Sequence, residues 1–405
     1  MAAADLLLTG IGQLVTNDPD RDGLLGLESG AAVAVKEGRV AWVGPEDGLL
    51  REFRQLPEID CDGRAVIPGF VDSHTHLVFG GNRADEFARR LRGESYEEIM
   101  AAGGGIQSTV TATRDASTAD LISQGVHRAR RMLGTGTTTV EVKSGYGLDL
   151  GTEVRMLEVA SAIDDLVPID VVKTFLGAHV VPVEHRDHRE AYVQEVIDEM
   201  LPEAAALASF CDVFCDDGAF TVDESRRILA AASALGMAPR LHANQLGHSG
   251  GAALAAEIGA VTADHLDHIT EDDVAGLKAA GTVAVLFPTV SLSLRLAPPP
   301  ARQLWDGGVP VAIATDCNPG TSYVENMQLV VATATLTAGL TPEEALWAAT
   351  RGGARALQMD DRGWITPGAS ADLVMLEAES YLEIPYRPGT DLVRMVIKDG
   401  EAVVS

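Results

Sequence analysis

The stretch VIPGFVDSHTH, residues 66–76, decides both the fold and the site of this chain. It starts as an apolar β run and ends in two histidines, His74 and His76, that one residue separates. Because side chains of a strand alternate between its two faces, both imidazoles point to the same side. Two such imidazoles can bind one metal ion, although the pattern alone also fits hydrogen-bonded histidines at a strand end.

Seven further β runs follow, separated by alanine-rich helical segments such as PEEALWAATRGGARAL (342–357). They are TTTVEVKSGYG (137–147), IDVVKTFLGAH (169–179), CDVFCDDGAF (211–220), APRLHANQL (238–246), AVTADHLDH (260–268), TVAVLFPTV (282–290) and PVAIATDCN (310–318). This alternation is typical of parallel βαβ units, and eight of them close a barrel. We therefore predict an α/β fold with a TIM-like (β/α)8 barrel, whose strand ends gather the polar residues in one pocket.

Both ends of the chain consist of short β runs and turns. AAVAVKEGRVAWVG (31–44) and VRMVIKDGEAVV (393–404) each place a tight turn between two apolar stretches. The simplest topology brings the two ends together in one small β-sandwich. We predict this domain from residues 1–67 and 359–405, and the barrel from residues 68–358.

Charge and cysteine content narrow the range of partners. With 31 basic and 59 acidic residues, the formal net charge is −28, which argues against nucleic acids and anionic membranes as partners. The N-terminal stretch has no basic segment before its short apolar run, so we expect no signal peptide or membrane span. The four scattered cysteines fit a reduced cytoplasm. We expect a small-molecule substrate and, as the commonest arrangement of soluble enzymes, a homodimer.

The ends of later β runs supply partners for the histidine pair. His242 ends the fifth run and Asp316 the eighth. Three imidazoles and a carboxylate suit one divalent metal ion, zinc or iron, and leave a position for water. Such an ion lowers the pKa of its water toward about 7. Asp316 could then carry the proton to a leaving nitrogen, while His265, at the end of the sixth run, stabilises the oxyanion.

Other strand ends suit an anionic substrate that forms hydrogen bonds. Arg83, in the loop after the first run, can hold a carboxylate with its planar guanidinium. Tyr146, His179 and Gln245 follow the second, third and fifth runs and could contact amide or ring nitrogens. Tyr96, beyond the first loop, is a weaker candidate.

The strings HTHLVFGGNRADEF (74–87), EVKSGYGLDL (141–150), TFLGAHVVP (174–182) and ATDCNPGTS (314–322) closely resemble the imidazolonepropionase family of the amidohydrolase superfamily. The resemblance covers essentially the whole barrel. It implies hydrolysis of 4-imidazolone-5-propanoate to N-formimidoyl-L-glutamate, a cyclic amide cleavage in histidine degradation. It also implies zinc or iron, held by His74, His76, His242 and Asp316. By the same resemblance, Arg83 would bind the substrate carboxylate, and Tyr146, His179 and Gln245 would contact the substrate. The opened product would be contacted by Asn318, Gly320 and Thr321.

Two features bear on the alternatives. Many binuclear relatives bridge two ions with a carboxylated lysine on strand four, but CDVFCDDGAF contains no lysine, which favours a single ion. Deaminases of the superfamily commonly carry an H-x-x-E motif on strand five, in which the glutamate shuttles a proton. This chain has Gln245 at the glutamate position, and a neutral amide cannot shuttle a proton in that way. Many relatives have residue types other than Asn244 and Cys317 at these two positions. The differences concern how the substrate is positioned. A barrel that binds a ligand without turnover is the alternative of another class.

Overall fold

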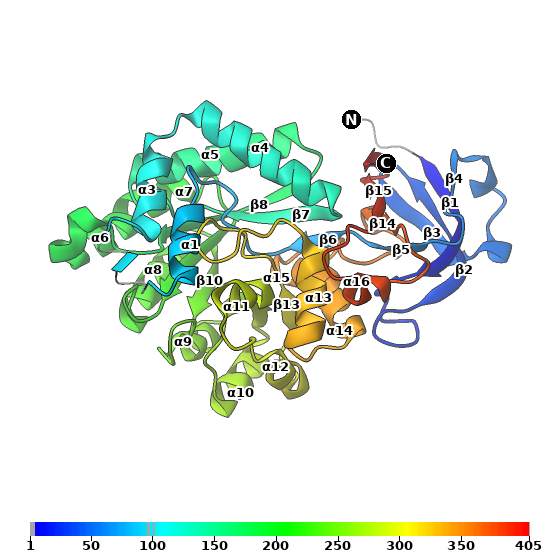
Figure 1. Cartoon of the computed structure of the whole chain (residues 1–405). Helices are drawn as coiled ribbons and strands as arrows, with labels where there is room; N and C mark the ends of the chain where they lie inside the picture. Colours follow the sequence, from blue (N-terminus) through cyan, green and yellow to red (C-terminus); the bar gives the residue numbers. More distant parts are fainter. Residues whose placement is uncertain (1–4, 95–97, 100–101, 405) are drawn as a thin grey trace.

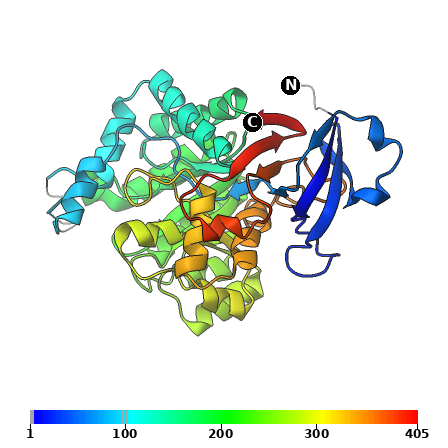
Figure 2. The ribbon, with the colours of Figure 1, turned by 45° about the vertical axis from the view of Figure 1, so that its right-hand side comes forward.

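The computed structural model describes residues 5–94, 98–99 and 102–404. The chain forms a large α/β barrel and a small β domain, which carries both chain termini on the right of Figure 1. Turning the molecule by 45° shows the strands near the C-terminus lying between the barrel and the N-terminal strands (Figure 2). Among the described residues, no helix has the length and apolar character needed to cross a lipid bilayer.

The barrel consists of parallel strands, eight in the described part of the chain, hydrogen-bonded in sequence order from β6 to β13. Their bounds are Phe70–Asp72 (β6), Thr137–Lys143 (β7), Asp170–Ala178 (β8), Phe210–Cys215 (β9), Ala238–Ala243 (β10), Thr262–His265 (β11), Val283–Leu286 (β12) and Val311–Ile313 (β13). Backbone hydrogen bonds from His76 N to Cys317 O (3.0 Å) and from Asp316 N to His74 O (3.1 Å) join the last strand to the first. The predicted barrel and its β runs are therefore confirmed.

Helices surround the barrel, and those that lie between its strands in the sequence connect them (Figure 1). They are α1 (Ala84–Leu91), α3 (Ile106–Asp115), α4 (Thr118–Gly134), α5 (Leu150–Leu166), α6 (Arg189–Glu195), α7 (Leu201–Ala204), α8 (Val222–Ala234), α9 (Gly251–Glu257), α10 (Glu271–Ala280), α11 (Pro288–Leu294), α12 (Ala301–Gly307), α13 (Met327–Thr337), α14 (Pro342–Trp347), α15 (Gly353–Ala356) and α16 (Glu383–Tyr386). Reciprocal capping boxes begin α8, α10 and α14, where a threonine and the acidic residue three positions later satisfy each other's backbone N–H groups.

The small domain is one continuous sheet in the order β16-β15-β14-β5-β1-β2-β3, with β4 paired to β1. Its strands are Leu6–Leu14 (β1), Glu28–Lys36 (β2), Arg39–Pro45 (β3), Glu58–Asp60 (β4), Ala65–Pro68 (β5), Leu373–Leu376 (β14), Val393–Lys398 (β15) and Glu401–Val404 (β16). The antiparallel pair β14 and β5 joins the two chain ends, as predicted. The exact domain boundaries stay a prediction.

Two hairpins of this sheet show why the sequence folds there. Glu37 and Gly38 connect β2 to β3 with φ of 51° and 74°, and Asp399 and Gly400 connect β15 to β16 with φ of 48° and 81°. A two-residue turn with both φ positive matches the natural twist of the flanking strands. The Glu-Gly and Asp-Gly pairs therefore fix the register of both hairpins.

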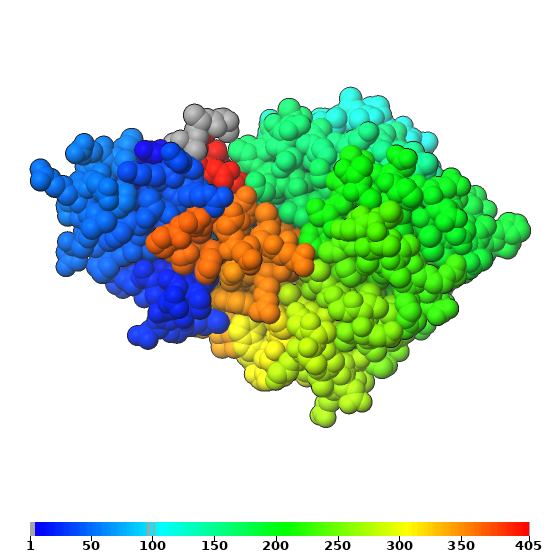
Figure 3. Space-filling model, turned by 180° about the vertical axis from the view of Figure 1, so that it is seen from behind, coloured from blue at the N-terminus to red at the C-terminus, as the bar shows by residue number. Residues whose placement is uncertain are grey.

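Contacts between the two domains hold the small sheet against the barrel, and Figure 3 shows their continuous surface from behind. Asn17 donates a hydrogen bond to Thr350 Oγ1 (2.8 Å). Lys398 Nζ lies 3.0 Å from a carboxylate oxygen of Asp170, which begins β8, and 3.1 Å from Asp372. Because Lys398 is nearly fully buried, this ion pair ties the last hairpin to the start of a barrel strand.

Candidate metal centre

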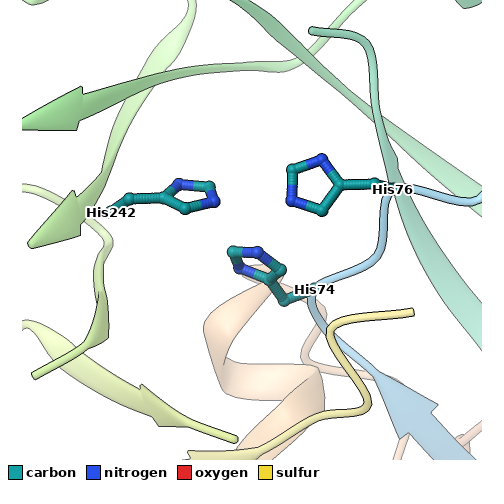
Figure 4. Close-up of side chains that lie close together, drawn as sticks. All are labelled: His74, His76 and His242. Carbon is teal, nitrogen blue, oxygen red and sulfur yellow. The ribbon is translucent and has the colours of Figure 1, made fainter. Parts of the chain in front are cut away.

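Three histidines converge at the carboxyl end of the barrel (Figure 4). His74 and His76 follow β6, and His242 lies in β10. One ring nitrogen of each lies within 4.8 Å of the corresponding nitrogens of the other two. All three residues are buried. His74 and His76 were predicted within the first strand but lie just past its end, and the convergence of the strand ends brings the three imidazoles together.

Asp316 completes this group. Its Oδ1 lies 3.6 Å from His74 Nε2 and 3.5 Å from His76 Nε2. Among the described residues, Asp316 Oδ1, His74 Nε2 and His242 Nε2 are buried without a hydrogen-bond partner. Buried polar atoms are rarely left unpaired in native proteins unless a ligand or ion satisfies them. The donor set and its unpaired atoms therefore fit a divalent metal ion.

The protonation of the histidines agrees with metal binding. Burial, and then the nearby charge of Lys143, lowers the pKa of His74 well below its ordinary value. Burial, and then the neighbouring His179, does the same for the pKa of His76. Both imidazoles are therefore neutral at physiological pH, which is the form that ligates a metal.

Carboxylates lie behind two of the histidines, and one of them orients the ring in front of it. His74 Nδ1 lies 2.6 Å from Asp264 Oδ2 and donates its proton there, which leaves Nε2 free to face the metal. His242 Nδ1 lies 3.0 Å from Asp212 Oδ2, at an ion-pair distance but without hydrogen-bond alignment. The fully buried Lys143 Nζ contacts Asp212 (2.8 Å) and Glu141 (2.7 Å).

Sequence reasoning missed these supporting charges. Burial alone would raise the pKa of Asp212, but the facing His242 and Lys143 hold it well below its ordinary value. Asp212 is therefore an ionised carboxylate in the barrel interior. The sequence does contain a sign of such a charge, because Asp212 is the one charged residue of the otherwise apolar strand FCDVFC (210–215). A charged residue at an inward position needs a partner of opposite charge.

The backbone at several strand ends is left-handed. Asn244, His265 and Asp316 have φ of 52°, 76° and 47°, a conformation that residues other than glycine rarely adopt. All three lie at or just past the ends of β10, β11 and β13. Such strain persists where the surroundings impose it, and here it occurs where the chain places His265 and Asp316 in the pocket.

His265 and His179 both neighbour His242. The His265 ring centroid is 5.2 Å from that of His242, and 4.5 Å from that of Phe287. His179 stacks on His76 at 5.0 Å, and its Nδ1 lies 2.9 Å from the carbonyl oxygen of Gly145, to which it donates. Burial, and then His242, lowers the pKa of His179 to about 3, so this ring is neutral.

Tyr146 packs beside these rings, with its centroid 5.6 Å from that of His76 and 5.4 Å from that of His179. The loop that carries Tyr146 wraps around the buried carboxylate of Glu153, which accepts hydrogen bonds from the backbone N–H groups of Gly145, Gly147 and Leu148. The structure thus places Tyr146 and His179 next to the candidate metal ligands.

The loop after β13 is built around Asn318. Its Oδ1 accepts hydrogen bonds from the N–H groups of Gly320 and Thr321, both at 2.8 Å, and its Nδ2 donates to Thr321 Oγ1 at 2.8 Å. Arg83 also reaches this loop. A Cβ added to Gly320 would overlap Arg83 Nη1 and lie 3.2 Å from its Cζ, so the glycine makes room for the guanidinium.

The structure says less about two of the predicted substrate contacts, Gln245 and Tyr96. Gln245 follows β10, and its backbone N–H donates to Asp216 Oδ2 at 2.7 Å, with the side chain half-buried. Tyr96 lies outside the described residues. A pocket of about 350 Å³ is lined by residues that include Val180, Val181 and Phe214, and none of the candidate metal ligands lines it. The Phe214 ring lies 5.6 Å from that of His242, so the pocket adjoins the histidine group and has room for a small molecule.

A barrel with histidines and an aspartate at its strand ends defines the class of metal-dependent amidohydrolases, and the comparisons agree with this class. Residues 65–403 match the model of the amidohydrolase family. An imidazolonepropionase of Mycolicibacterium smegmatis is 49% identical over 399 residues, which cover 98% of this chain and 97% of that protein. One of Myxococcus xanthus is 50% identical, covering 93% of this chain and 90% of that protein. The chain belongs to the amidohydrolase family and, within it, to the imidazolonepropionases.

Solved structures share the fold at low sequence identity. A 5-methylcytosine deaminase from Klebsiella pneumoniae superposes with a TM-score of 0.76 and 17% identity, covering 98% of this chain and 97% of that one. An atrazine chlorohydrolase from Arthrobacter aurescens, complexed with zinc, has a TM-score of 0.71 and 15% identity, covering 99% and 95%. Because these identities are low, the likeness supports the fold alone.

Proposed function

We propose that this protein hydrolyses the cyclic amide bond of 4-imidazolone-5-propanoate and releases N-formimidoyl-L-glutamate, a step of histidine degradation. Imidazolonepropionases that share about half of its residues support the reaction. The observation that carries the proposal is the position of Arg83, a carboxylate-binding group, at the Gly320 loop that follows the candidate ligand Asp316.

The metal would be one zinc or iron ion held by His74, His76, His242 and Asp316. When bound, a divalent ion acidifies water so that a nucleophile is available at neutral pH. Strand β9, the fourth strand of the barrel, contains no lysine that could bridge a second ion. This supports a single metal ion. The same ligands accept zinc and iron, so availability decides between them.

The chain's own acids and bases would handle the protons. Asp316 Oδ1 lies beside both His74 and His76, where it can accept a proton from the attacking water and deliver it to the ring nitrogen that leaves. Burial, and then the neighbouring His242, lowers the pKa of His265 well below its ordinary value. A neutral His265 can donate one N–H hydrogen bond to the oxygen of the attacked carbonyl.

The substrate contacts that we propose are those that the resemblance to imidazolonepropionases implies. Arg83 would bind the propanoate carboxylate, and Tyr146, His179 and Gln245 would contact the ring. The backbone and side chains of the loop after β13 would contact the opened product through Asn318, Gly320 and Thr321, with Tyr96 as a further candidate contact. The enzyme would be cytoplasmic, and the four cysteines of the described chain, all free and buried, agree with a reducing compartment. A homodimer is the commonest arrangement for such an enzyme.

An assay with freshly generated imidazolonepropanoate tests the proposal. Metal-loaded protein is mixed with the compound, and the loss of its ultraviolet absorbance is followed against the spontaneous rate. We expect acceleration that depends on protein concentration and on metal. A rate equal to the spontaneous one would refute the proposed function.

A further inference from the structure

The helix α1 presents a row of charged side chains to the Gly320 loop. Arg83 immediately precedes the helix, and Glu86 and Arg90 lie four residues apart, a spacing that places them on one face. Arg83 and Arg90 both reach Gly320. Arg83 Nη1 occupies the space where a Gly320 Cβ would be, and Arg90 Nη1 lies 3.3 Å from Gly320 O, to which it donates.

Glu86 pairs directly with Arg83. It accepts hydrogen bonds from Arg83 Nε (2.8 Å), from Ser108 Oγ (2.9 Å) and from the N–H of Gly105 (3.1 Å). Although burial alone would raise its pKa, the bond from Arg83 lowers the pKa of Glu86, so the carboxylate is ionised. With Nε bound to Glu86, the two terminal nitrogens of Arg83, which have no hydrogen-bond acceptor in the described part of the chain, remain for another acceptor.

Arg90 is incompletely satisfied. Its Nη2 is buried and has no hydrogen-bond partner among the residues that the structure describes. Burial, and then the charge of Arg83, lowers the pKa of Arg90. A buried donor of a charged group that finds no acceptor is unfavourable, and a second guanidinium nearby adds repulsion.

We propose that Arg90 is a second carboxylate-binding residue, which holds the propanoate group of the substrate together with Arg83. Among the described residues, two guanidiniums share one paired carboxylate here, and a ligand carboxylate would neutralise the net positive charge of this group. The same ligand supplies an acceptor for the unpaired Arg90 Nη2. This inference rests on the proposed function, because that function provides a substrate with a carboxylate.

The kinetic test compares Arg90→Met with Arg92→Met, an exposed arginine at the end of the same helix. Loss of a charged hydrogen bond to the substrate should raise KM about 10-fold or more in Arg90→Met and leave kcat within about 3-fold. Arg92→Met should keep the KM of the unchanged protein. Arg90→Lys should recover part of the loss, because lysine keeps the charge but not the planar pair of donors.

Binding of propionate separates this inference from the proposed function. Its dissociation constant is measured by thermal shift on the metal-loaded protein, and we expect about 10-fold weaker binding in Arg90→Met and no change in Arg92→Met. If imidazolonepropanoate is not turned over but propionate binding still depends on Arg90, the proposed function fails and the anion site stands. If Arg90→Met and Arg90→Lys both keep the original KM and propionate affinity, the inference about Arg90 is wrong. A fall in kcat or in melting temperature with unchanged KM would likewise reject it, because it would show that Arg90 only supports the Gly320 loop.

Discussion

Replacing Gly320 by alanine should weaken substrate binding without unfolding the protein. The added Cβ would overlap Arg83 Nη1 and lie 3.2 Å from Arg83 Cζ and 3.3 Å from Asn318 Oδ1. The guanidinium is the end of a flexible side chain, so it can move away at little cost in stability. Glu86 holds its Nε, however, so the movement turns the terminal nitrogens out of their present position.

The size of the effect follows from the contact that is disturbed. A charge-assisted hydrogen bond contributes about 1.5–3 kcal/mol, and 1.4 kcal/mol corresponds to about tenfold in binding. We therefore expect Gly320→Ala to raise KM roughly 10- to 100-fold, with a melting temperature within about 2 °C of the original protein. Steady-state kinetics and a thermal melt measure both quantities.

Gly134→Ala is the matched control, because a Cβ at this helix-end position meets open space. It should leave KM unchanged. If Gly320→Ala also keeps the original KM, the substrate carboxylate does not bind at Arg83, and the proposed orientation of the substrate is wrong.

Three other perturbations give distinct outcomes. Asp316→Asn should lower kcat by about 10³-fold or more, because an amide cannot carry the proton, while the circular dichroism spectrum stays unchanged. Near-native turnover would show that another residue transfers the proton. Removing metal with a chelator should abolish activity, and adding back zinc or iron should restore it, whereas full activity of metal-free protein would contradict the proposed centre. The third perturbation concerns Glu224. Burial alone would raise the pKa of this residue, but hydrogen bonds from Arg189 and Thr221 lower it to about 2. Because this pKa is depressed, the stabilisation is present above about pH 4.5 and is lost as the pH falls toward 2. Glu224→Gln should therefore be less stable than the original protein in urea melts at pH 7 and equally stable near pH 2, and a pH-independent difference would refute the ion pair's contribution.

The sequence allowed the barrel to be predicted because every strand is a short apolar run with polar residues at its end. The histidine pair, His242 and Asp316 could be selected for the same reason, since barrel strand ends meet on one face. The turns at 37–38 and 399–400 were equally visible, because glycine next to an acidic residue favours positive φ.

Other parts of the site depend on packing between distant segments. Lys143 and Asp212 lie on different strands, and their periodicity shows only that both side chains point inward, not that they pair at 2.8 Å. Arg90 meets the carbonyl oxygen of Gly320 across 230 positions of sequence. The helical spacing of Glu86 and Arg90 was visible, but the surface that this helix faces is set by the tertiary fold.

Hydrolysis in water enriched in ¹⁸O tests the central claim most directly. Cleavage of the cyclic amide bond forms a new carboxylate, so the account predicts N-formimidoyl-L-glutamate with one ¹⁸O in that carboxylate, detected by mass spectrometry. Attack at the amidine carbon, as a deaminase-like site would perform it, would leave the amide intact and put the ¹⁸O into a formyl group. That product, or the absence of any labelled product above the spontaneous rate, would contradict the account.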